Sequence, residues 1–528
     1  MRADAVVIGA GHNGLVAGAY LARAGLRTLI LERRSVIGGA SVTEELWPGF
    51  QVSRAAYVAG LLRPRVIREL DLHAHGLRLL RRSPSSYTPL PDGRGLLLGE
   101  GPAADRRAIG AFSRRDAERY PQYEAFLDRI ARLLEPLLDA PPPDPAHPRW
   151  RDLRTLARLA RGAWRVRGDL ASAAALLLGP ARPALEAWFE SEPLRATLAT
   201  DAVIGAWAPP SAPGTGYVLF HHVMGETHGE RGVWAYVQGG MGRLAQAIAS
   251  AAREANAEIR TDAPVRRIEI EGGRVCGVSL EDGTHIETRA VLSSADPRVT
   301  LLGLAGPDHL PDSLSRGIDG LDFRSGSVKI NLALERLPAF HGRGGGAAGP
   351  EHRGTIHVGA NDLDALDAAF ASADRGTLPE RPIVELTLPS AVDDTIAPEG
   401  RHIASLFVQY APYAPAADGG WDALREPFAD RVCALVDEVA PGFSESVLHR
   451  EVLAPPDLER IFGLTGGNIF HGAMSLDRLA FMRPLPGCGH YRTPVTGLYL
   501  CGAGTHPGGG VMGACGRNAA HEFLRTHR

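Results

Sequence analysis

The first thirty-two residues carry the pattern that most restricts the fold of this chain. A continuous apolar run at residues 5–8 predicts a strand buried on both faces of a parallel sheet. It leads into a G-x-G-x-x-G turn at residues 9–14, a helix rich in small residues over 15–24, and a second apolar strand at 28–31 that ends on Glu32. Strand, turn, helix, strand and acid in this order predict a βαβ unit that binds a dinucleotide.

The residue types in this turn suit a bound pyrophosphate. Gly9 permits the tight turn, Gly11 lets the backbone approach the phosphates, and Gly14 allows the helix to pack closely on the strand. The start of the helix, which includes Asn13, presents unpaired N–H groups and the positive end of the helix dipole. Glu32 lies 21 positions after Gly11, where a carboxylate accepts hydrogen bonds from ribose hydroxyls. We therefore predict that these residues bind the cofactor.

Length and composition exclude several classes of protein. A chain of 528 residues is expected to form two or three cores, and its net charge of −3 gives no electrostatic basis for binding nucleic acid. The five cysteines are widely spaced and none forms a C-x-x-C pair, so we predict no metal site and a reducing, cytoplasmic setting. No run of eighteen apolar residues occurs, and the first strand begins by about Ala5, so we expect neither a membrane span nor a signal peptide.

The residues after the second strand identify the type of dinucleotide. The segment Glu32-Arg33-Arg34-Ser35-Val36-Ile37-Gly38-Gly39 resembles the E-x-R-x-x-x-G-G extension of flavoproteins related to monoamine oxidases and phytoene desaturases. The resemblance implies that the cofactor is FAD. It also implies that Arg34 lies near the adenosine part, and that Gly38, Gly39 and the following Ala40 run beside the pyrophosphate.

A second group of elements lies in the middle of the chain. Gly-Gly-Met-Gly at 239–242 predicts a helix to about residue 255, followed by short strands at 258–260, 265–270 and 290–292 with glycine turns between them. This flavoprotein class re-enters its FAD domain in that order, so the resemblance implies that the backbone around Val265 contacts the adenine. No second dinucleotide motif with a strand and an acid follows. We therefore predict that oxygen or a quinone, and not NAD(P)H, reoxidises the flavin.

The last sixty residues contain the other strong signal. A buried strand over 497–502 leads into the glycine-rich segment 503–513 and then a helix to about residue 524. The exposed N–H groups at that helix start suit negative charge on a flavin ring, and glycines let the backbone pass close to it. We predict cofactor contacts at Gly502, Gly510, Val511 and Met512.

This segment, and residues 463–472 before it, look like the phytoene desaturase-related superfamily of FAD-dependent oxidoreductases. The resemblance is nearest to the branch of the vertebrate mitochondrial protein named after a pyridine nucleotide-disulphide oxidoreductase domain, although this chain lacks a disulphide motif. It implies an α/β fold, with a two-part Rossmann-like FAD-binding domain of the glutathione-reductase or monoamine-oxidase type, an inserted α+β substrate domain and a helical cap. The expected FAD-binding segments are 1–75, 236–300 and 456–528, the substrate or helical cap insertion is 76–235, and the substrate domain is 301–455.

Two departures from the monoamine-oxidase pattern bear on the substrate. That group usually has an arginine directly after the glycine pair, whereas this chain has Ala40. The group also places a lysine near the flavin N5, but the only lysine here, Lys329, falls in a strand of the predicted substrate domain. Both departures argue against an amine oxidase.

The relatives in this superfamily desaturate, saturate or isomerise carbon–carbon bonds of apolar, often polyene, substrates. The resemblance therefore implies a dehydrogenase that desaturates a hydrophobic, isoprenoid or polyene, molecule by hydride transfer to flavin N5. Two alternatives stay open, a redox-neutral flavin-dependent isomerase and a non-catalytic interaction protein that keeps FAD in its core. Candidate acid–base residues are His471 and His506. For both histidines a structural role is an equal or better interpretation, and Asn468, Tyr491 and Arg492 are further residues near the flavin by sequence.

One helix of the predicted cap is basic on one side. From Arg151 the sequence places Arg154, Arg158, Arg161 and Arg165 on one helical face, with Leu153 and Leu156 on another. A basic amphipathic helix of this kind can lie on an anionic membrane. The other interpretation, a solvated surface of the cap, is favoured by the sequence, so peripheral membrane contact stays a hypothesis.

Overall fold

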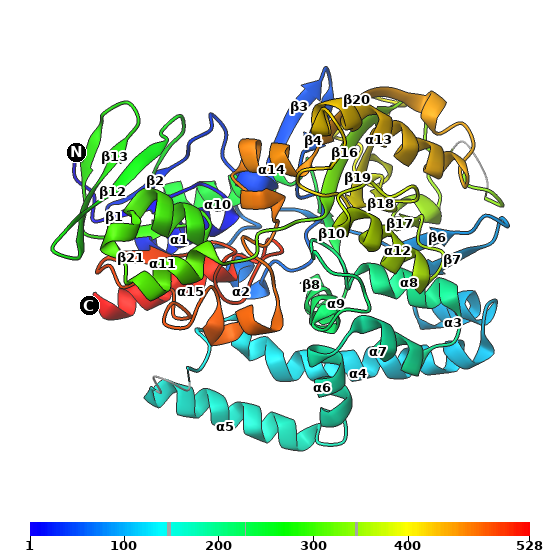
Figure 1. Ribbon diagram of the computed structural model, residues 1–528, viewed down its shortest axis with the longest axis horizontal. Coiled ribbons are helices and arrows are strands. Elements are labelled where there is room, and N and C mark those ends of the chain that lie inside the picture. Colours follow the sequence, from blue (N-terminus) through cyan, green and yellow to red (C-terminus); the bar gives the residue numbers. More distant parts are fainter. Residues whose placement is uncertain (145–148, 228, 344–346, 528) are drawn as a thin grey trace.

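The computed structural model describes residues 1–144, 149–227, 229–343 and 347–527. Figure 1 shows three parts: a sheet with its helices near both chain ends, a larger sheet on the opposite side, and a layer of helices beneath the larger sheet. The described chain contains no helix that is both long and apolar enough to cross a membrane.

The first sheet gathers strands from three distant parts of the chain. Its five strands are all parallel, in the order β11-β2-β1-β15-β21. Their bounds are β1 Ala5–Ile8, β2 Thr28–Leu31, β11 Glu258–Arg260, β15 Val291–Ser293 and β21 Leu498–Leu500. This arrangement is the Rossmann-like α/β sheet predicted from the sequence. Its strands come from the beginning, the middle and the end of the chain.

Both faces of this sheet are covered, which explains why its strands are apolar on both sides. Ala5 and Val7 belong to a core formed with α1 (His12–Arg23), α10 (Gly242–Glu254) and α15 (Ala514–Thr526). Val6 and Ile8 point the other way, into a core formed with the meander β12 (Val265–Glu271), β13 (Arg274–Leu280) and β14 (His285–Glu287) and with α11 (Asp312–Asp319).

The second sheet is mixed and has seven strands in the order β20-β16-β19-β18-β17-β6-β7. Five of them come from residues after 326, namely β16 Ser327–Leu334, β17 Thr355–Val358, β18 Ile383–Thr387, β19 His402–Gln409 and β20 Val447–Leu453. The other two, β6 Ser86–Pro89 and β7 Gly95–Leu98, precede the helical layer, and β6 pairs in parallel with β17. The substrate-domain sheet therefore contains strands from the first insertion as well.

The two faces of the second sheet differ in chemistry although both are buried. On one face Val328, Ile330, Val384 and Leu406 form a core with α13 (Gly420–Asp437). The opposite face carries mainly polar side chains, and these are buried too: Ser327, Lys329, Asn331, His357, Glu385, Thr387, Ser405 and Gln409. A buried polar face needs partners or a ligand, because unsatisfied polar groups are costly inside a protein.

Helices cover the second sheet from below. The layer comprises α3 Pro102–Gly110, α4 Arg114–Leu138, α6 Leu170–Leu178, α7 Ala181–Trp188, α8 Glu192–Thr200 and α9 Thr215–Val223. Helix α5 Trp150–Arg165 contacts α4 and lies apart from the second sheet. Ser113 caps α4, since its hydroxyl accepts a hydrogen bond from the N–H of Asp116 at 3.1 Å. The smaller elements are three antiparallel strand pairs, β3 Thr43–Trp47 with β4 Phe50–Ser53, β5 Leu79–Arg81 with β10 Ala235–Val237, and β8 Glu226–Thr227 with β9 Glu230–Arg231. The remaining helices are α2 Pro64–Glu69, α12 Leu363–Asp374 and α14 Pro455–Phe462.

One helix under the second sheet contains a proline in its interior. Helix α13 begins at Gly420 and continues through Pro427 to Asp437. Pro427 lies eight positions into the helix, and the buried Trp421 and Phe428 on either side of it both pack into the core under the second sheet. Tertiary packing thus outweighs the local tendency of proline to end a helix.

Candidate functional site

The glycines of the first turn are required for different structural reasons. A Cβ on Gly14 would lie 2.0 Å from the Gly9 carbonyl oxygen, so Gly14 is required by contact inside the protein. Gly9 itself has a φ of +89°, which glycine adopts without strain. A Cβ on Gly11 would meet nothing closer than the Gly39 Cα at 4.0 Å. Gly11 lines a cavity, so its missing side chain leaves space for something other than this chain.

Glu32 is held in place where the second strand ends. Its carboxylate accepts hydrogen bonds from the Ala10 N–H at 2.8 Å and the Arg34 N–H at 3.0 Å, one on each oxygen. The side chain is buried and lines the same cavity as Gly11. Each carboxylate oxygen has a second lone pair, so the group can still accept from ribose hydroxyls.

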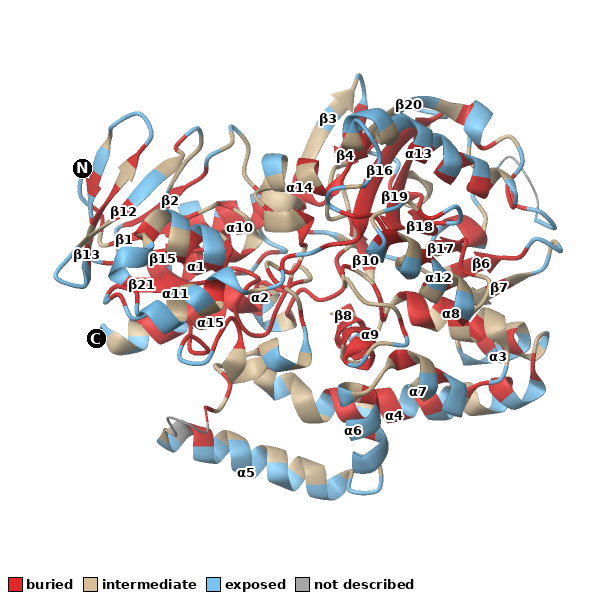
Figure 2. Ribbon diagram, in the orientation of Figure 1, coloured by how far each residue is buried: buried red, intermediate tan, exposed pale blue. Residues whose placement is uncertain are grey.

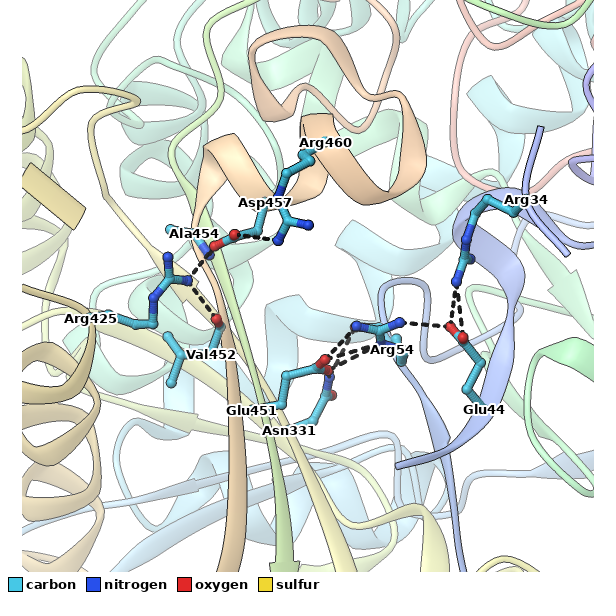
Figure 3. Close-up of polar contacts among 10 residues, drawn as sticks. All are labelled: Arg34, Glu44, Arg54, Asn331, Arg425, Glu451, Val452, Ala454, Asp457 and Arg460. Atoms are coloured by element: carbon cyan, nitrogen blue, oxygen red, sulfur yellow. Dashed lines mark hydrogen bonds and ion pairs between the residues drawn. The ribbon is translucent and has the colours of Figure 1, made fainter. Parts of the chain in front are cut away.

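Arg34 belongs to a chain of ion pairs that joins the two sheets (Figure 3). Its Nη2 donates to both carboxylate oxygens of Glu44 at 2.9 Å, and Arg54 donates to Glu44 at 2.9 Å and to Glu451 of β20 at 2.6 Å. Asn331 of β16 donates to Glu451 as well. Burial alone would raise the pKa of Glu44, but hydrogen bonds from Arg34 and Arg54 hold it below its ordinary value.

One continuous cavity of about 960 Å³ connects the parts of the site. Ten of the predicted cofactor-binding residues line it: Gly9, Gly11, Asn13, Glu32, Arg34, Gly39, Ala40, Val265, Gly510 and Val511. They come from all three segments of the chain that build the first sheet. The close approach of α1 and α15 brings the two chain ends together, since a Cβ on Gly516 would lie 2.0 Å from the Asn13 carbonyl oxygen.

The other four predicted cofactor-binding residues are not among those that line the cavity, so their contact with the cofactor stays a prediction. Gly14 is packed against Gly9, and Gly502 against the Ser294 carbonyl oxygen, which a Cβ would approach to 2.3 Å. Gly38 has a φ of +119° and donates its N–H to Ala10 at 2.9 Å. Met512 is buried in the helical core and its carbonyl accepts from the Arg63 N–H at 3.0 Å. These residues shape the backbone that faces the cavity.

The two predicted catalytic histidines occupy different places. His506 does not line the cavity, because its ring is buried against α4 and its Nε2 lies 2.8 Å from the Leu137 carbonyl oxygen. Burial lowers its pKa to about 4. Through this contact His506 anchors its loop to α4, and its role as an acid–base group stays a prediction.

His471 does line the cavity, together with His12, which the sequence analysis passed over because it lies inside the glycine turn. His471 Nδ1 and His12 Nε2 are both buried without a hydrogen-bond partner. Burial lowers the pKa of His471, and it lowers that of His12 to about 4, so both rings are neutral.

The three remaining sequence candidates are anchors. Asn468 donates to the Arg324 carbonyl at 2.8 Å, Tyr491 donates to the His506 carbonyl at 2.9 Å, and Arg492 donates to Glu522 at 2.9 Å.

The residues present fit FAD. A cradle made by glycine backbone, an acid held at a strand end, and a buried arginine Nη1 and histidine Nε2 without partners all face one cavity. The helix start beside Gly11 supplies the N–H groups that favour phosphate.

The far end of the cavity was missed by the sequence analysis. Its wall includes the polar face of the second sheet and side chains opposite to it, namely Tyr57, Arg82, Asp201, Lys329, His357 and Glu385, which we call the polar floor. Lys329 lies in β16 of the second sheet, and its side chain lines the cavity. The lysine therefore belongs to the site although its strand lies far from the FAD-binding segments in the sequence. One feature of the sequence could have indicated this polar face. Polar and apolar residues alternate in β16, β18 and β19, which the structure shows to be buried along almost their whole length.

Known proteins resemble this chain along nearly its whole length. The family described as flavin containing amine oxidoreductase matches residues 14–522. The rat protein named pyridine nucleotide-disulfide oxidoreductase domain-containing protein 2 is 50% identical over 541 residues, which cover 99% of this chain and 93% of that protein. The phytoene desaturase (lycopene-forming) of Pantoea ananas is 27% identical, over 97% of this chain and 96% of that protein. A solved oxidoreductase from Methanosarcina mazei superposes with a TM-score of 0.60 at 17% identity, over 99% of this chain and all of that one, which shows a shared fold.

Proposed function

The chain belongs to the flavin-containing amine oxidoreductase family and is an FAD-dependent oxidoreductase; from this premise we propose that it desaturates a hydrophobic small molecule. The proposal includes an isoprenoid or polyene type of substrate, with oxygen or a quinone as the final electron acceptor. The name of the phytoene desaturase relative supports carbon–carbon desaturation as the reaction class.

The chain's own residues would hold FAD along the first part of the cavity. Gly9, Gly11 and the start of α1 would bind the pyrophosphate, Glu32 the ribose hydroxyls, and Arg34 and Val265 the adenosine. Gly510 and Val511 would lie against the flavin ring. When bound, the flavin supplies a hydride acceptor for a substrate C–H bond.

Desaturation also releases a proton, which a group of the protein or solvent must accept. His471 is our candidate, because its neutral ring lines the cavity and its Nδ1 has no partner within the described chain. A neutral imidazole with a free ring nitrogen accepts a proton. We expect His471→Ala to slow flavin reduction at least tenfold while FAD stays bound, whereas His506→Ala should act through stability.

The observation that carries the proposal is the continuity of the cavity. The space that begins at the FAD cradle extends past apolar side chains to the second sheet, and Leu61, Val223, Trp234, Phe407 and Phe470 line it on the way. Apolar walls beside a flavin position exclude water from the reacting carbon atoms and orient a hydrophobic substrate.

The test is an anaerobic visible spectrum of the purified protein before and after adding isoprenoid and other apolar compounds. We expect a flavin spectrum that bleaches with at least one compound, with one double bond gained per flavin reduced. A product with the same mass as the substrate would favour the isomerase instead. This outcome includes a reaction in which the flavin stays oxidised and a reaction that requires reduced flavin. A flavin spectrum that no compound changes would favour a non-catalytic role, and a colourless protein that cannot be reconstituted would contradict the whole proposal.

We also propose peripheral contact with an anionic membrane through α5 and α6. Figure 2 shows these two helices at the edge of the molecule, largely exposed. Trp150 and Trp164 of α5 are 87% and 68% exposed, and Leu153, Leu156 and, in α6, Leu178 are also exposed. The exposed arginines, from Arg154 to Arg165, lie beside this apolar face on α5. Exposed tryptophan and leucine flanked by arginine favour the interface of an anionic bilayer.

Vesicle co-sedimentation tests the membrane proposal. Arg158→Glu combined with Arg161→Glu should weaken binding to phosphatidylserine-containing vesicles at least tenfold, while binding to uncharged vesicles stays weak in both proteins. The matched control is Arg106→Glu with Arg107→Glu, a charge reversal of the same size on the exposed face of α3. Equal co-sedimentation of all three proteins would contradict the proposal.

A further inference from the structure

The polar floor is organised by the strand register of the second sheet. Lys329 of β16 pairs with Phe407 of β19, Phe407 pairs with Glu385 of β18, and Glu385 pairs with His357 of β17. The four side chains therefore form one row across four strands, on the sheet face that borders the cavity. An amine and a carboxyl group lie on either side of an aromatic ring in this row.

Tyr57, which also lines the cavity, contacts both polar members of this row. The Lys329 Nζ lies 4.2 Å from the centre of the Tyr57 ring, and the Tyr57 hydroxyl donates to Glu385 Oε2 at 3.1 Å. Lys329 also donates to the Ser405 hydroxyl. An ammonium group has three N–H bonds, so at least one remains for a ligand.

Two further groups at the floor have hydrogen-bonding capacity that the protein leaves unused. Arg82 is 3% exposed and its Nε has no partner, and Ser327 is fully buried with a hydroxyl that has none. Both side chains line the cavity. A buried donor without a partner is unfavourable, and a plain hydrocarbon in this space would leave it without a partner.

The polar floor contains as many basic as acidic side chains. Two basic side chains, Arg82 and Lys329, face two acidic ones, Asp201 and Glu385. Burial, followed by the nearby Asp201, raises the pKa of Glu385 to about 8, and burial raises that of Asp201 to about 7 and lowers that of Lys329 to about 7. Burial thus favours the neutral forms of Glu385, Asp201 and Lys329, and it likewise disfavours a ligand with a full charge beside them.

We propose that the polar floor binds an uncharged oxygen group of the substrate, a hydroxyl or a carbonyl, between Lys329 and Glu385. The substrate is therefore an oxygenated apolar molecule and not a plain hydrocarbon, an amine or a carboxylate. The oxygen accepts a hydrogen bond from Lys329, and a hydroxyl also donates one to Glu385. This inference rests on the proposed function, because it concerns the molecule that the same cavity takes up.

The test compares ligands that share one carbon skeleton. The FAD-loaded full-length protein is titrated with limonene, perillyl alcohol, perillic acid and perillylamine, and binding is measured by calorimetry and by the change in the flavin spectrum. We expect the alcohol to bind at least tenfold more tightly than the hydrocarbon, and the acid and the amine to bind more weakly than the alcohol. The same comparison with farnesol, farnesoic acid, farnesylamine and the parent C15 hydrocarbon covers longer substrates.

Variants of the row identify the residues responsible. Glu385→Gln and Lys329→Met should each reduce the preference for the alcohol to less than threefold, while the hydrocarbon binds as it does to the unchanged protein. The control is Glu351→Gln, which alters a buried glutamate beside His352 that lies outside the cavity wall. This control should keep the full preference.

Three results would overturn the inference. The first is that neither alcohol is preferred over its hydrocarbon, including the case in which no compound of either set binds. The second is that an acid or an amine is preferred, and the third is that the preference survives both row variants. A failure of the proposed function is distinguishable, because it appears as a protein without a flavin spectrum or as a flavin that no bound ligand reduces.

Discussion

Both sheets of this molecule are buried, but they differ in which of their faces are apolar. The parallel sheet has helices on one face and the meander β12–β14 on the other, and its strands are apolar on both sides. The seven-stranded sheet is apolar only where α13 covers it, and its other face is polar and borders the cavity. Under the proposed function, the first sheet would hold the cofactor through backbone at its strand ends, whereas the second presents side chains from the middle of its strands to the cavity.

This difference shows how one chain separates two tasks. A dinucleotide is recognised mainly by N–H groups and by space, so the first sheet needs glycines and one acid at fixed positions. A substrate is recognised by the pattern of its own polar groups, so the second sheet needs side chains whose spacing is set by strand register. The two regions meet in one cavity and are joined by the Arg34–Glu44–Arg54–Glu451 ion pairs.

The largest expected effect separates packing from cofactor space within the first region. Gly14→Ala should lower the free energy of unfolding by more than about 3 kcal/mol, because the new Cβ meets the Gly9 carbonyl. Gly11→Ala should change the stability of the FAD-free protein by less than about 1 kcal/mol, yet weaken FAD binding at least tenfold. Thermal unfolding without FAD and an FAD titration measure the two quantities. A Gly11→Ala protein that binds FAD normally would show that this space is not the pyrophosphate site.

The second prediction tests whether the polar face of the other sheet costs stability. Because the pKa of Glu385 is raised from 4.5 to about 8, the folded protein holds a proton that the unfolded chain releases between these values. The contribution of Glu385 to stability therefore falls as pH rises from about 4.5 to 8, by on the order of 4 kcal/mol at most. Glu385→Gln should remove this fall. Denaturant unfolding at pH 5 and pH 8.5 checks it, and parallel curves for the two proteins would contradict it.

The smallest expected effect concerns the connection between the two regions. Arg54→Met removes the arginine that pairs with Glu44 on one side and Glu451 on the other, and these groups are half-buried. We expect a loss of about 1–3 kcal/mol in the free energy of unfolding, together with weaker FAD binding, because Glu44 also orients Arg34. Arg260→Met, which removes an exposed pair with Glu258, is the control and should unfold at the midpoint of the unchanged protein. A normal FAD affinity in Arg54→Met would indicate that the two regions are independent.

The sequence alone predicted most of the first region. Residues 5–14 and 28–32 form contiguous patterns, and Gly11 and Glu32 lie at the cavity where these patterns put them. The sequence did not show that Gly14, Gly38, Gly502 and Met512 lie behind the wall, or that the His506 ring contacts the Leu137 carbonyl on α4. Whether a residue in a glycine-rich loop faces a ligand or its own protein depends on elements far away in the chain.

What the sequence by itself determined is the α/β fold of the FAD-binding part, because local periodicity and glycine spacing are properties of neighbouring residues. Only the tertiary structure decided the substrate end of the cavity. Lys329 and Glu385 lie on different strands and become neighbours through strand pairing, and Tyr57, hundreds of positions before both, reaches them from a loop. Strand register brings together residues that no local pattern relates, and each is an ordinary polar residue until the fold buries it beside the others.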